Sequence, residues 1–237
     1  MLLNPIRNTM LNAAGLFACL ALAAGVTGCK IHVDKGANGE DKNVQVDTPF
    51  AKIHVDKSAN GEDKNVQVDT PFGGIHVNTD QTTAADLGLP VYPGAEIVKD
   101  KENDKSADIH MGFGEWELRV KVVNYSSPDS QDKVTAFYKK ALERYGDVIS
   151  CQGNAPVGTP TATSEGLTCA DDKGNTTTVQ IDRKDYGIGN SGFELKAGSK
   201  HHQHIVGFES SAPGQTRFAL VALDLPFGTG EGSGKSD

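Results

Sequence analysis

Hydrophobic and polar residues alternate with period two along much of this chain, which is the pattern of strands with one buried face. In the stretch Glu115–Tyr125, the side chains of Trp116, Leu118, Val120 and Val122 share one face and charged residues take the other. Similar segments recur along the rest of the chain. Further strands are predicted at Ala95–Lys99, Ile109–Phe113, Asp147–Cys151, Leu167–Ala170, Thr176–Asp182, Gly192–Lys196, His204–Glu209 and Thr216–Leu225.

One segment has helical periodicity instead. Its apolar residues recur at spacings of three and four: Val134, Phe137, Tyr138, Ala141, Leu142 and Tyr145. Pro128 stands near the predicted start and Gly146 just past the end, as helix boundaries favour. Strands, one helix and more strands predict an α+β fold, in which one main amphipathic helix packs on an antiparallel β-sheet.

A 22-residue repeat precedes this region. Lys30–Ala51 and Lys52–Gly73 differ at only two positions, and a third unit begins at Gly74 and then diverges. Each unit contains two alternating segments around an Asn-Gly turn signal, which predicts a β-hairpin. A disordered polar spacer is the alternative. Recurrent histidines, His32, His54 and His76, would line up if the units stack, either as a zinc or copper ladder or, more simply, as solvent-facing side chains.

The N-terminus has the composition of a secretory signal: Arg7, an apolar run from Leu11 to Val26, and small residues before a cysteine. The sequence Val26–Cys29 resembles the lipobox of bacterial prolipoproteins. The resemblance implies cleavage before Cys29 and acylation of its sulfur, which would anchor the chain without a spanning helix. A transmembrane anchor is the alternative interpretation. Lys30, where an aspartate retains enterobacterial lipoproteins in the inner membrane, favours the outer membrane by the same resemblance.

These patterns divide the chain into four parts. They are a cleaved signal peptide (1–28), a lipidated N-terminus with the repeats (29–83), a globular α+β domain (84–227) and a disordered tail (228–237). The segments Pro90–Ala95 and Phe137–Gly146 resemble uncharacterised bacterial lipoproteins, a resemblance that implies no activity.

The net charge of −8 becomes one unit more negative when the signal peptide removes Arg7. An acidic chain is a poor partner for nucleic acid or for an anionic lipid surface. We therefore expect no nucleic-acid partner, and membrane association through the lipid alone.

The chain has four cysteines, of which Cys19 leaves with the signal and Cys29 carries the lipid. Cys151 and Cys169 remain, and an oxidising compartment favours a disulfide between them. Two free buried thiols are the first alternative. A metal or redox pair is the second, although the spacing fits neither pattern.

Few residues suggest chemistry. Ser130 and Lys133 form an SxxK motif without the other motifs of penicillin-binding enzymes, so capping of the helix is the simpler explanation. His201, His202 and His204 cluster beside a predicted strand, where His202 and His204 would share a face as two metal ligands. A third ligand would have to come from His110 or an acidic residue.

Three hypotheses follow. The first is a non-enzymatic lipoprotein without a cofactor, a tethered module that binds another component of the cell envelope. The second is a lipoprotein that binds a small ligand or a metal, with His201, His202 and His204 as its site. The third is a hydrolase that uses Ser130 and Lys133.

Overall fold

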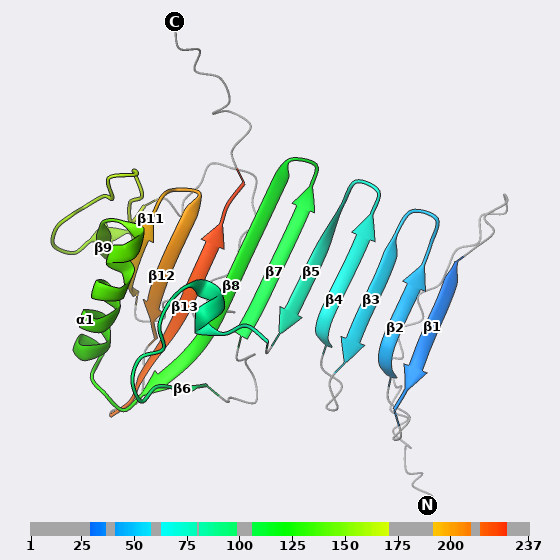
Figure 1. Cartoon of the computed structure of the whole chain (residues 1–237), viewed down its shortest axis with the longest axis horizontal. Helices are drawn as coiled ribbons and strands as arrows, with labels where there is room; N and C mark the ends of the chain where they lie inside the picture. Colours follow the sequence, from blue (N-terminus) through cyan, green and yellow to red (C-terminus); the bar gives the residue numbers. More distant parts are fainter. Residues whose placement is uncertain are drawn as a thin grey trace, which may run out of the picture.

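Among the residues that the structure describes, the fold is dominated by one antiparallel sheet of 13 strands, with a single α-helix on one face (Figure 1). The computed structural model describes residues 29–36, 41–57, 63–79, 81–98, 106–170, 192–209 and 214–226. The sheet has the order β1-β2-β3-β4-β5-β7-β8-β13-β12-β11-β9-β10, and β6 pairs with β8 outside this path. The fold is therefore α+β, as predicted, with much more sheet than helix.

The elements fall into an N-terminal run of strands and a second group that includes the helix. The first strands are β1 (Lys30–Lys35), β2 (Asp41–Asp47), β3 (Lys52–Lys57), β4 (Asp63–Thr70) and β5 (Gly73–Thr79). The others are β6 (Glu96–Ile97), β7 (Ser106–Phe113), β8 (Trp116–Ser127), β9 (Val148–Gln152), β10 (Ala155–Pro156), β11 (Phe193–Gly198), β12 (His202–Phe208) and β13 (Thr216–Asp224). The helices are α1 (Gln131–Leu142) and the 3-10 turns η1 (Ala84–Leu87) and η2 (Glu143–Tyr145).

The two repeat units form consecutive antiparallel hairpins, β1–β2 and β3–β4, with the same register. Lys30 lies opposite Asp47 in the first hairpin, and Lys52 lies opposite Asp69 in the second. Both hairpins also have an irregularity at the same place, after Asp34 and after Asp56. Of the two alternatives for this region, ordered hairpins are the one that the described residues adopt.

The repeats and the following region share the sheet. The third, partial unit forms β5, which pairs on one side with β4 and on the other with β7. In the second pairing, Ile75 lies opposite Met111 and Val77 opposite Ile109, so the apolar rows continue across the junction. One sheet thus runs through the boundary predicted between residues 83 and 84.

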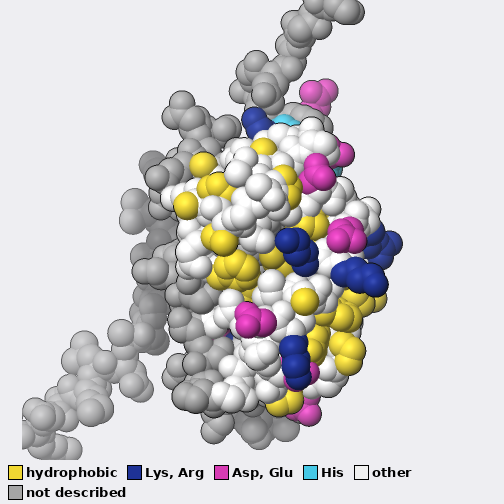
Figure 2. All heavy atoms as spheres, turned by 90° about the vertical axis from the view of Figure 1, so that its left-hand side faces the viewer, with side chains coloured by type: hydrophobic (Ala, Val, Ile, Leu, Met, Phe, Trp, Pro, Cys, Tyr) yellow, Lys and Arg dark blue, Asp and Glu magenta, His cyan; other side chains and the backbone are white. Residues whose placement is uncertain are grey.

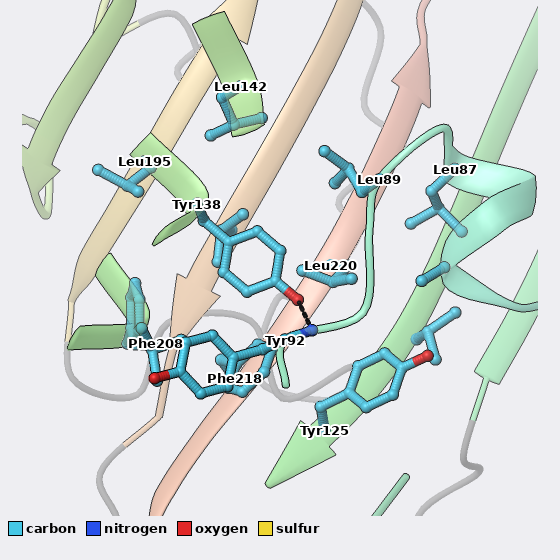
Figure 3. Close-up of a cluster of buried hydrophobic side chains, with 14 of the residues drawn as sticks. Leu87, Leu89, Tyr92, Tyr125, Tyr138, Leu142, Leu195, Phe208, Phe218 and Leu220 are labelled. Carbon is cyan, nitrogen blue, oxygen red and sulfur yellow. Dashed lines mark hydrogen bonds between the residues drawn. The ribbon is translucent and has the colours of Figure 1, made fainter. Parts of the chain in front are cut away.

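The main core lies between α1, the segment after η1 and one face of strands β8, β13, β12, β11 and β9. Its central members are Leu87, Leu89, Tyr92, Tyr125, Tyr138, Leu142, Leu195, Phe208, Phe218 and Leu220 (Figure 3). From α1 only Val134, Tyr138 and Leu142 are fully buried, four residues apart. The buried stripe of the helix is therefore narrower than the sequence pattern predicts, and Phe137 and Ala141 are only partly covered.

The opposite face of the sheet has two smaller apolar clusters. One contains Leu118, Val120 and Val122 of β8, with Trp116 against it, as the alternation predicted. The other contains Ile149, Leu167 and the two cysteines Cys151 and Cys169. The sheet thus has an apolar layer on both of its faces, because residues of β8 and β9 alternate between them.

Some predicted elements differ in the structure. Leu167–Ala170 forms no strand, because Leu167 N donates to the Thr163 side chain and Gly166 N to the Thr163 carbonyl within a local turn. The α-helix ends at Leu142, earlier than predicted. The 3-10 turn η2 follows it and ends at Tyr145, just before Gly146. The strand predicted at Thr176–Asp182 and the tail at 228–237 lie outside the described residues, as does the signal peptide.

Candidate binding face

One row of polar side chains crosses nine neighbouring strands on the face that carries α1. Cross-strand pairing places these residues opposite one another in the order His32, Gln45, His54, Gln67, His76, His110, Arg119, Asp224 and His202. We call this row the polar ladder. A parallel row contains Asp34, Asn43, Asp56, Asn65, Asn78, Asp108 and Lys121. Period-two geometry keeps both rows on one face, since opposite residues of an antiparallel pair share a side.

Each histidine of the repeats lies within ion-pair distance of a carboxylate. His32 Nε2 is 3.1 Å from Asp34 Oδ1 and His54 Nε2 is 3.0 Å from Asp56 Oδ1. His76 has the different partner Asp69, at 2.9 Å. The side chains of these histidines are 74%, 44% and 43% exposed, so the pairs are accessible to a partner while held in regular positions.

His76 changes partner where the repeat ends. Its neighbour in the sheet is His110, whose ring lies edge-on at a centroid distance of 6.2 Å. Asn78 stands where an aspartate stands in the complete units, so the nearest carboxylate is Asp69 on β4. Hydrogen bonds from His76 and then Gln67 lower the pKa of the Asp69 carboxyl, which is therefore ionised at neutral pH.

A shallow depression of about 160 Å³ lies on this face between the second unit and the third. It is lined by His54, Asp56, Asn65, Val66, Gln67, His76 and Asn78. Both hydrogen-bond donors and acceptors are present in it, since the amides of Asn and Gln donate through NH₂ and accept through the carbonyl oxygen, and carboxylates only accept. The lining suits a polar group better than an apolar ligand.

Beyond the repeats, charged pairs continue the ladder. His110 Nε2 lies 2.9 Å from Glu117 Oε1. Arg119 donates from Nε and Nη2 to the two carboxylate oxygens of Asp108, at 3.1 and 2.8 Å. This bidentate pair raises the pKa of Arg119 and holds a planar guanidinium in the row.

The predicted lipidation residue lies at the start of this face. Cys29 is exposed, is not in a disulfide, and directly precedes β1. In the part of the chain that the structure describes, no helix has the length and apolar character needed to cross a membrane. The predicted acylation of Cys29 thus stays a prediction, with an accessible thiol at the required position.

The predicted disulfide between Cys151 and Cys169 is present. Both residues are buried, and they tie β9 to the segment around Leu167, with Ile149 and Leu167 packed around them. The bond closes a loop of 18 residues, which in the chain-entropy model stabilises the fold by about 3 kcal/mol. It adds a covalent restraint to the isolated bridges Ala162–Thr168 and Gly166–Ser199 that also hold this loop.

The predicted histidine cluster is distributed between two different environments. His202 and His204 do share a face of β12, but His202 Nδ1 lies 2.9 Å from Asp224 Oδ1 while the ring of His204 stacks on Tyr145. His201 precedes the strand and its carbonyl accepts from Leu225 N. Among the described residues, no group of three or more His, Cys, Asp or Glu side chains is arranged to hold a metal ion.

His204 has an unusual environment for a strand histidine. The centroids of the His204 and Tyr145 rings lie 3.5 Å apart at an interplanar angle of 10°, and Arg144 Cζ lies over the Tyr145 ring, 5.3 Å from its centroid. Burial is the main reason that the pKa of His204 is lowered, and the positive charge of Arg144 adds to the effect. The neutral imidazole is therefore the form that packs here.

The SxxK motif has a structural explanation. Lys133 Nζ lies 2.7 Å from Asp129 Oδ1, four residues earlier, and not against Ser130. Ser130 is the N-cap residue of α1 by position but makes no side-chain capping bond. Asp129 also accepts a hydrogen bond from the Tyr92 hydroxyl, so it joins the start of the helix to the segment before β6.

On the end of the molecule nearest α1, hydrophobic patches alternate with both basic and acidic side chains (Figure 2). A hollow of about 470 Å³ lies between η1 and α1, lined by Ala85, Gly88, Leu89, Pro90, Ala141 and Arg144. Arg144 and Tyr145 both donate to the Gly88 carbonyl across it. These hydrogen bonds use the polar groups of the hollow within the fold, which makes the polar ladder the stronger candidate for binding.

Sequence reasoning identified the alignment of His32, His54 and His76 but missed the rest of the ladder. Gln45 and Gln67 could have been found, because period two places them opposite the histidines in any hairpin with this turn. His110 and Arg119 enter the row only through the β5–β7 pairing, which no local pattern indicates.

Comparison of the chain with protein-family models, with curated proteins and with solved structures finds no match.

Proposed function

We propose that this protein is a lipid-anchored, non-enzymatic component of the bacterial cell envelope that binds another envelope component through the polar ladder. The observation that carries the proposal is the continuity of the sheet. Because the repeats continue the sheet of the helical region in register, one polar face extends from the strand after Cys29 to His202. An outer-membrane location follows from the lipobox resemblance and from Lys30.

The ladder supports binding rather than catalysis by the way its groups are arranged. Its histidines and carboxylates are paired with one another and repeat every two strands, a spacing of about 10 Å. Two units that differ at only two positions offer the same set of donors and acceptors twice on one sheet surface. Such a surface suits an extended polar partner that makes several similar weak contacts, which together give useful affinity.

Site-specific cross-linking in living cells tests the binding face. A photoreactive residue replaces Gln67, which is exposed in the ladder, and in a matched control it replaces Lys140, which is exposed on α1. We expect a recurrent cross-linked species from position 67 and not from position 140. The same species should be lost when His54→Ala and His76→Ala are combined with the probe at position 67.

Two results would contradict the binding proposal. One is equal capture from both positions, which would indicate proximity without a preferred face. The other is capture at position 67 that survives both histidine substitutions. Circular dichroism on the double variant shows whether the sheet is retained, and both histidines are sufficiently exposed that it should be.

The anchor has its own test. Cys29→Ser removes the sulfur that would be acylated, so we expect the protein to move from the membrane fraction to the soluble envelope fraction. Mass spectrometry of the N-terminal peptide should find acyl chains on Cys29 of the natural chain. Unchanged membrane association of the variant, or an unmodified Cys29 in the natural chain, would contradict the proposal that the protein is a lipoprotein.

A further inference from the structure

Three turns lie at the same end of the sheet as Cys29. Because β1 and β2 are antiparallel, β1 begins at the end where β2 finishes and turns into β3. The β4–β5 and β7–β8 turns lie at that end as well, along the upper border of the sheet in Figure 1. Pairing of Gly73 with Phe113, and of Phe113 with Trp116, brings the last two turns level with each other.

Each of these turns exposes an aromatic side chain. Phe50 is 75% exposed, Phe72 83% and Phe113 45%, and Trp116 packs against Phe113 at a ring distance of 6.0 Å. These four residues are here called the aromatic rim. Exposed phenylalanines at three successive turns are unusual, since each exposed ring loses the favourable free energy of burial.

The first two phenylalanines are held outward by the same turn. Thr48 Oγ1 donates to the Ala51 carbonyl and accepts from Phe50 N, and Thr70 Oγ1 donates to the Gly73 carbonyl and accepts from Phe72 N. The Thr-Pro-Phe turn is thus a built feature that recurs with the repeat. Its two copies stand two strands apart, about 10 Å.

We propose that the aromatic rim lies in the interface of the bilayer that holds the lipid of Cys29. This inference rests on the proposed lipid anchor, which keeps this end of the sheet beside the membrane. Aromatic side chains are favoured at the boundary between hydrocarbon and headgroups, and a phospholipid surface is the apolar phase within reach.

Electrostatic attraction to anionic lipid does not explain the proposed contact between the rim and the bilayer. Lys30 and Lys52 lie near the rim, but in the sheet they stand opposite Asp47 and Asp69. The same row continues to Glu117, so it has more acidic than basic side chains and does not attract anionic lipid. The contact is therefore hydrophobic and should resist high salt, unlike the attraction of a basic patch to anionic lipid.

The orientation has a consequence for the repeats. With the rim in the interface, the strands stand away from the bilayer and the polar ladder runs along it. Each repeat then widens the polar face parallel to the membrane. A sheet suspended from β1 alone would instead move the helical region outward by about 10 Å per unit.

Fluorescence quenching by brominated lipid tests the orientation. The chain has one tryptophan, so Trp116→Phe with Phe72→Trp places a single probe in the rim. The control, Trp116→Phe with Val91→Trp, places it at a residue 49% exposed beside Tyr92, whose hydroxyl bonds Asp129 beyond the opposite end of β8. The full-length lipidated protein is purified from membranes and reconstituted into phosphatidylethanolamine and phosphatidylglycerol vesicles with brominated acyl chains.

We expect loss of emission and a blue shift for the tryptophan at position 72 at low and high salt, and neither for the one at position 91. Native Trp116 should also be quenched, and less so when Phe50→Ser and Phe72→Ser are combined. Equal quenching at positions 72 and 91, or none at position 72 in protein that floats with the vesicles, would overturn the rim proposal and leave the anchor intact. An unmodified Cys29 in the mass spectrum would contradict both the lipid anchor and the rim proposal that rests on it.

Discussion

Tyr138 links α1 to the segment before β6 through one buried hydroxyl. The hydroxyl donates to the Pro90 carbonyl at 3.1 Å and accepts from Tyr92 N at 3.2 Å, the bond drawn in Figure 3. The ring packs on Phe218 in the centre of the core, with a centroid distance of 5.4 Å. Burial raises the pKa of Tyr138, so the hydroxyl stays protonated and keeps both bonds.

Tyr138→Phe keeps the ring but leaves the Pro90 carbonyl and Tyr92 N–H without this partner. An unsatisfied buried polar group costs about 1–3 kcal/mol, so we expect a loss of this size in the free energy of unfolding, measured by urea denaturation. Tyr145→Phe is the control, since its hydroxyl is only partly buried and makes one bond to Gly88. Equal losses in the two variants would contradict the special role of Tyr138.

His204 makes stability depend on pH. Because burial lowers its folded-state pKa below the ordinary histidine value of 6.5, the unfolded chain binds a proton more readily than the folded chain as the pH falls. The stabilisation from the buried neutral ring is fully present above the pKa of His204 in the unfolded chain. It is lost as the pH falls through the lower pKa of His204 in the folded chain. His204→Phe keeps a ring over Tyr145 but removes the titration.

Unfolding free energies at about pH 7.5 and about pH 5.5 should therefore differ less in His204→Phe than in the natural chain. His202→Phe serves as the control, since that histidine is exposed and paired with Asp224. An equal pH dependence in natural protein and His204→Phe would show that burial of His204 does not control this window.

At the scale of elements, Gly73 explains one of the two differences between the repeat units. Its φ of 153° favours glycine, and an added Cβ would lie 2.0 Å from the Gly112 carbonyl oxygen on β7. Ala51, at the same position of the first unit, precedes β3, which has a second unit beside it. The glycine is needed only where the repeat meets β7.

Two deletions of equal length separate this effect from the loss of a unit. Removal of 30–51 keeps Gly73 next to β7, whereas removal of 52–73 places Ala51 there. We expect the second deletion to be less stable than the first by more than about 1 kcal/mol, because alanine does not fit this backbone. Ala51→Gly in the second deletion should restore stability, and thermal unfolding measures all three. Equal stability of the two deletions would contradict the steric argument.

At the scale of the whole molecule, the sheet grows by addition of hairpins. The paired faces of neighbouring units are equivalent, as β2 pairs with β3 in the same rows in which β4 pairs with β5. A unit can therefore be inserted or removed without changing the register of the rest. Nearest-neighbour stacking of this kind is how repeat proteins gain stability.

The long dimension of the molecule should change by about 10 Å for each unit, since each adds two strands. Small-angle scattering on chains with 30–51 deleted or duplicated after Cys29 measures this, with the natural chain as reference. No change in the maximum dimension would mean that the hairpins do not extend the sheet in solution.

Local patterns sufficed for the elements and for part of the candidate site. Alternation identified most of β7, β8 and β13, and the 3.6-residue period identified α1. The Cys151–Cys169 pairing was predicted from the expected oxidising compartment and from the roles expected of the other two cysteines. The strand predicted at Leu167–Ala170 was wrong, because an apolar residue beside a disulfide can be buried without forming a strand. The repeats indicated hairpins because each unit contains both of its own strands.

By contrast, contacts between residues far apart in the chain appear only in the folded molecule. The pairing of β5 with β7 brings His110 and Arg119 into the polar ladder, requires glycine at position 73, and places Phe113 beside Phe72 and at the end of the sheet that holds Cys29. Periodicity states which face a side chain takes, because it depends only on neighbours along the chain. Which strands become neighbours depends on the packing of the whole sheet. The pairing of β5 with β7 therefore joins polar residues from separate parts of the chain into one continuous face.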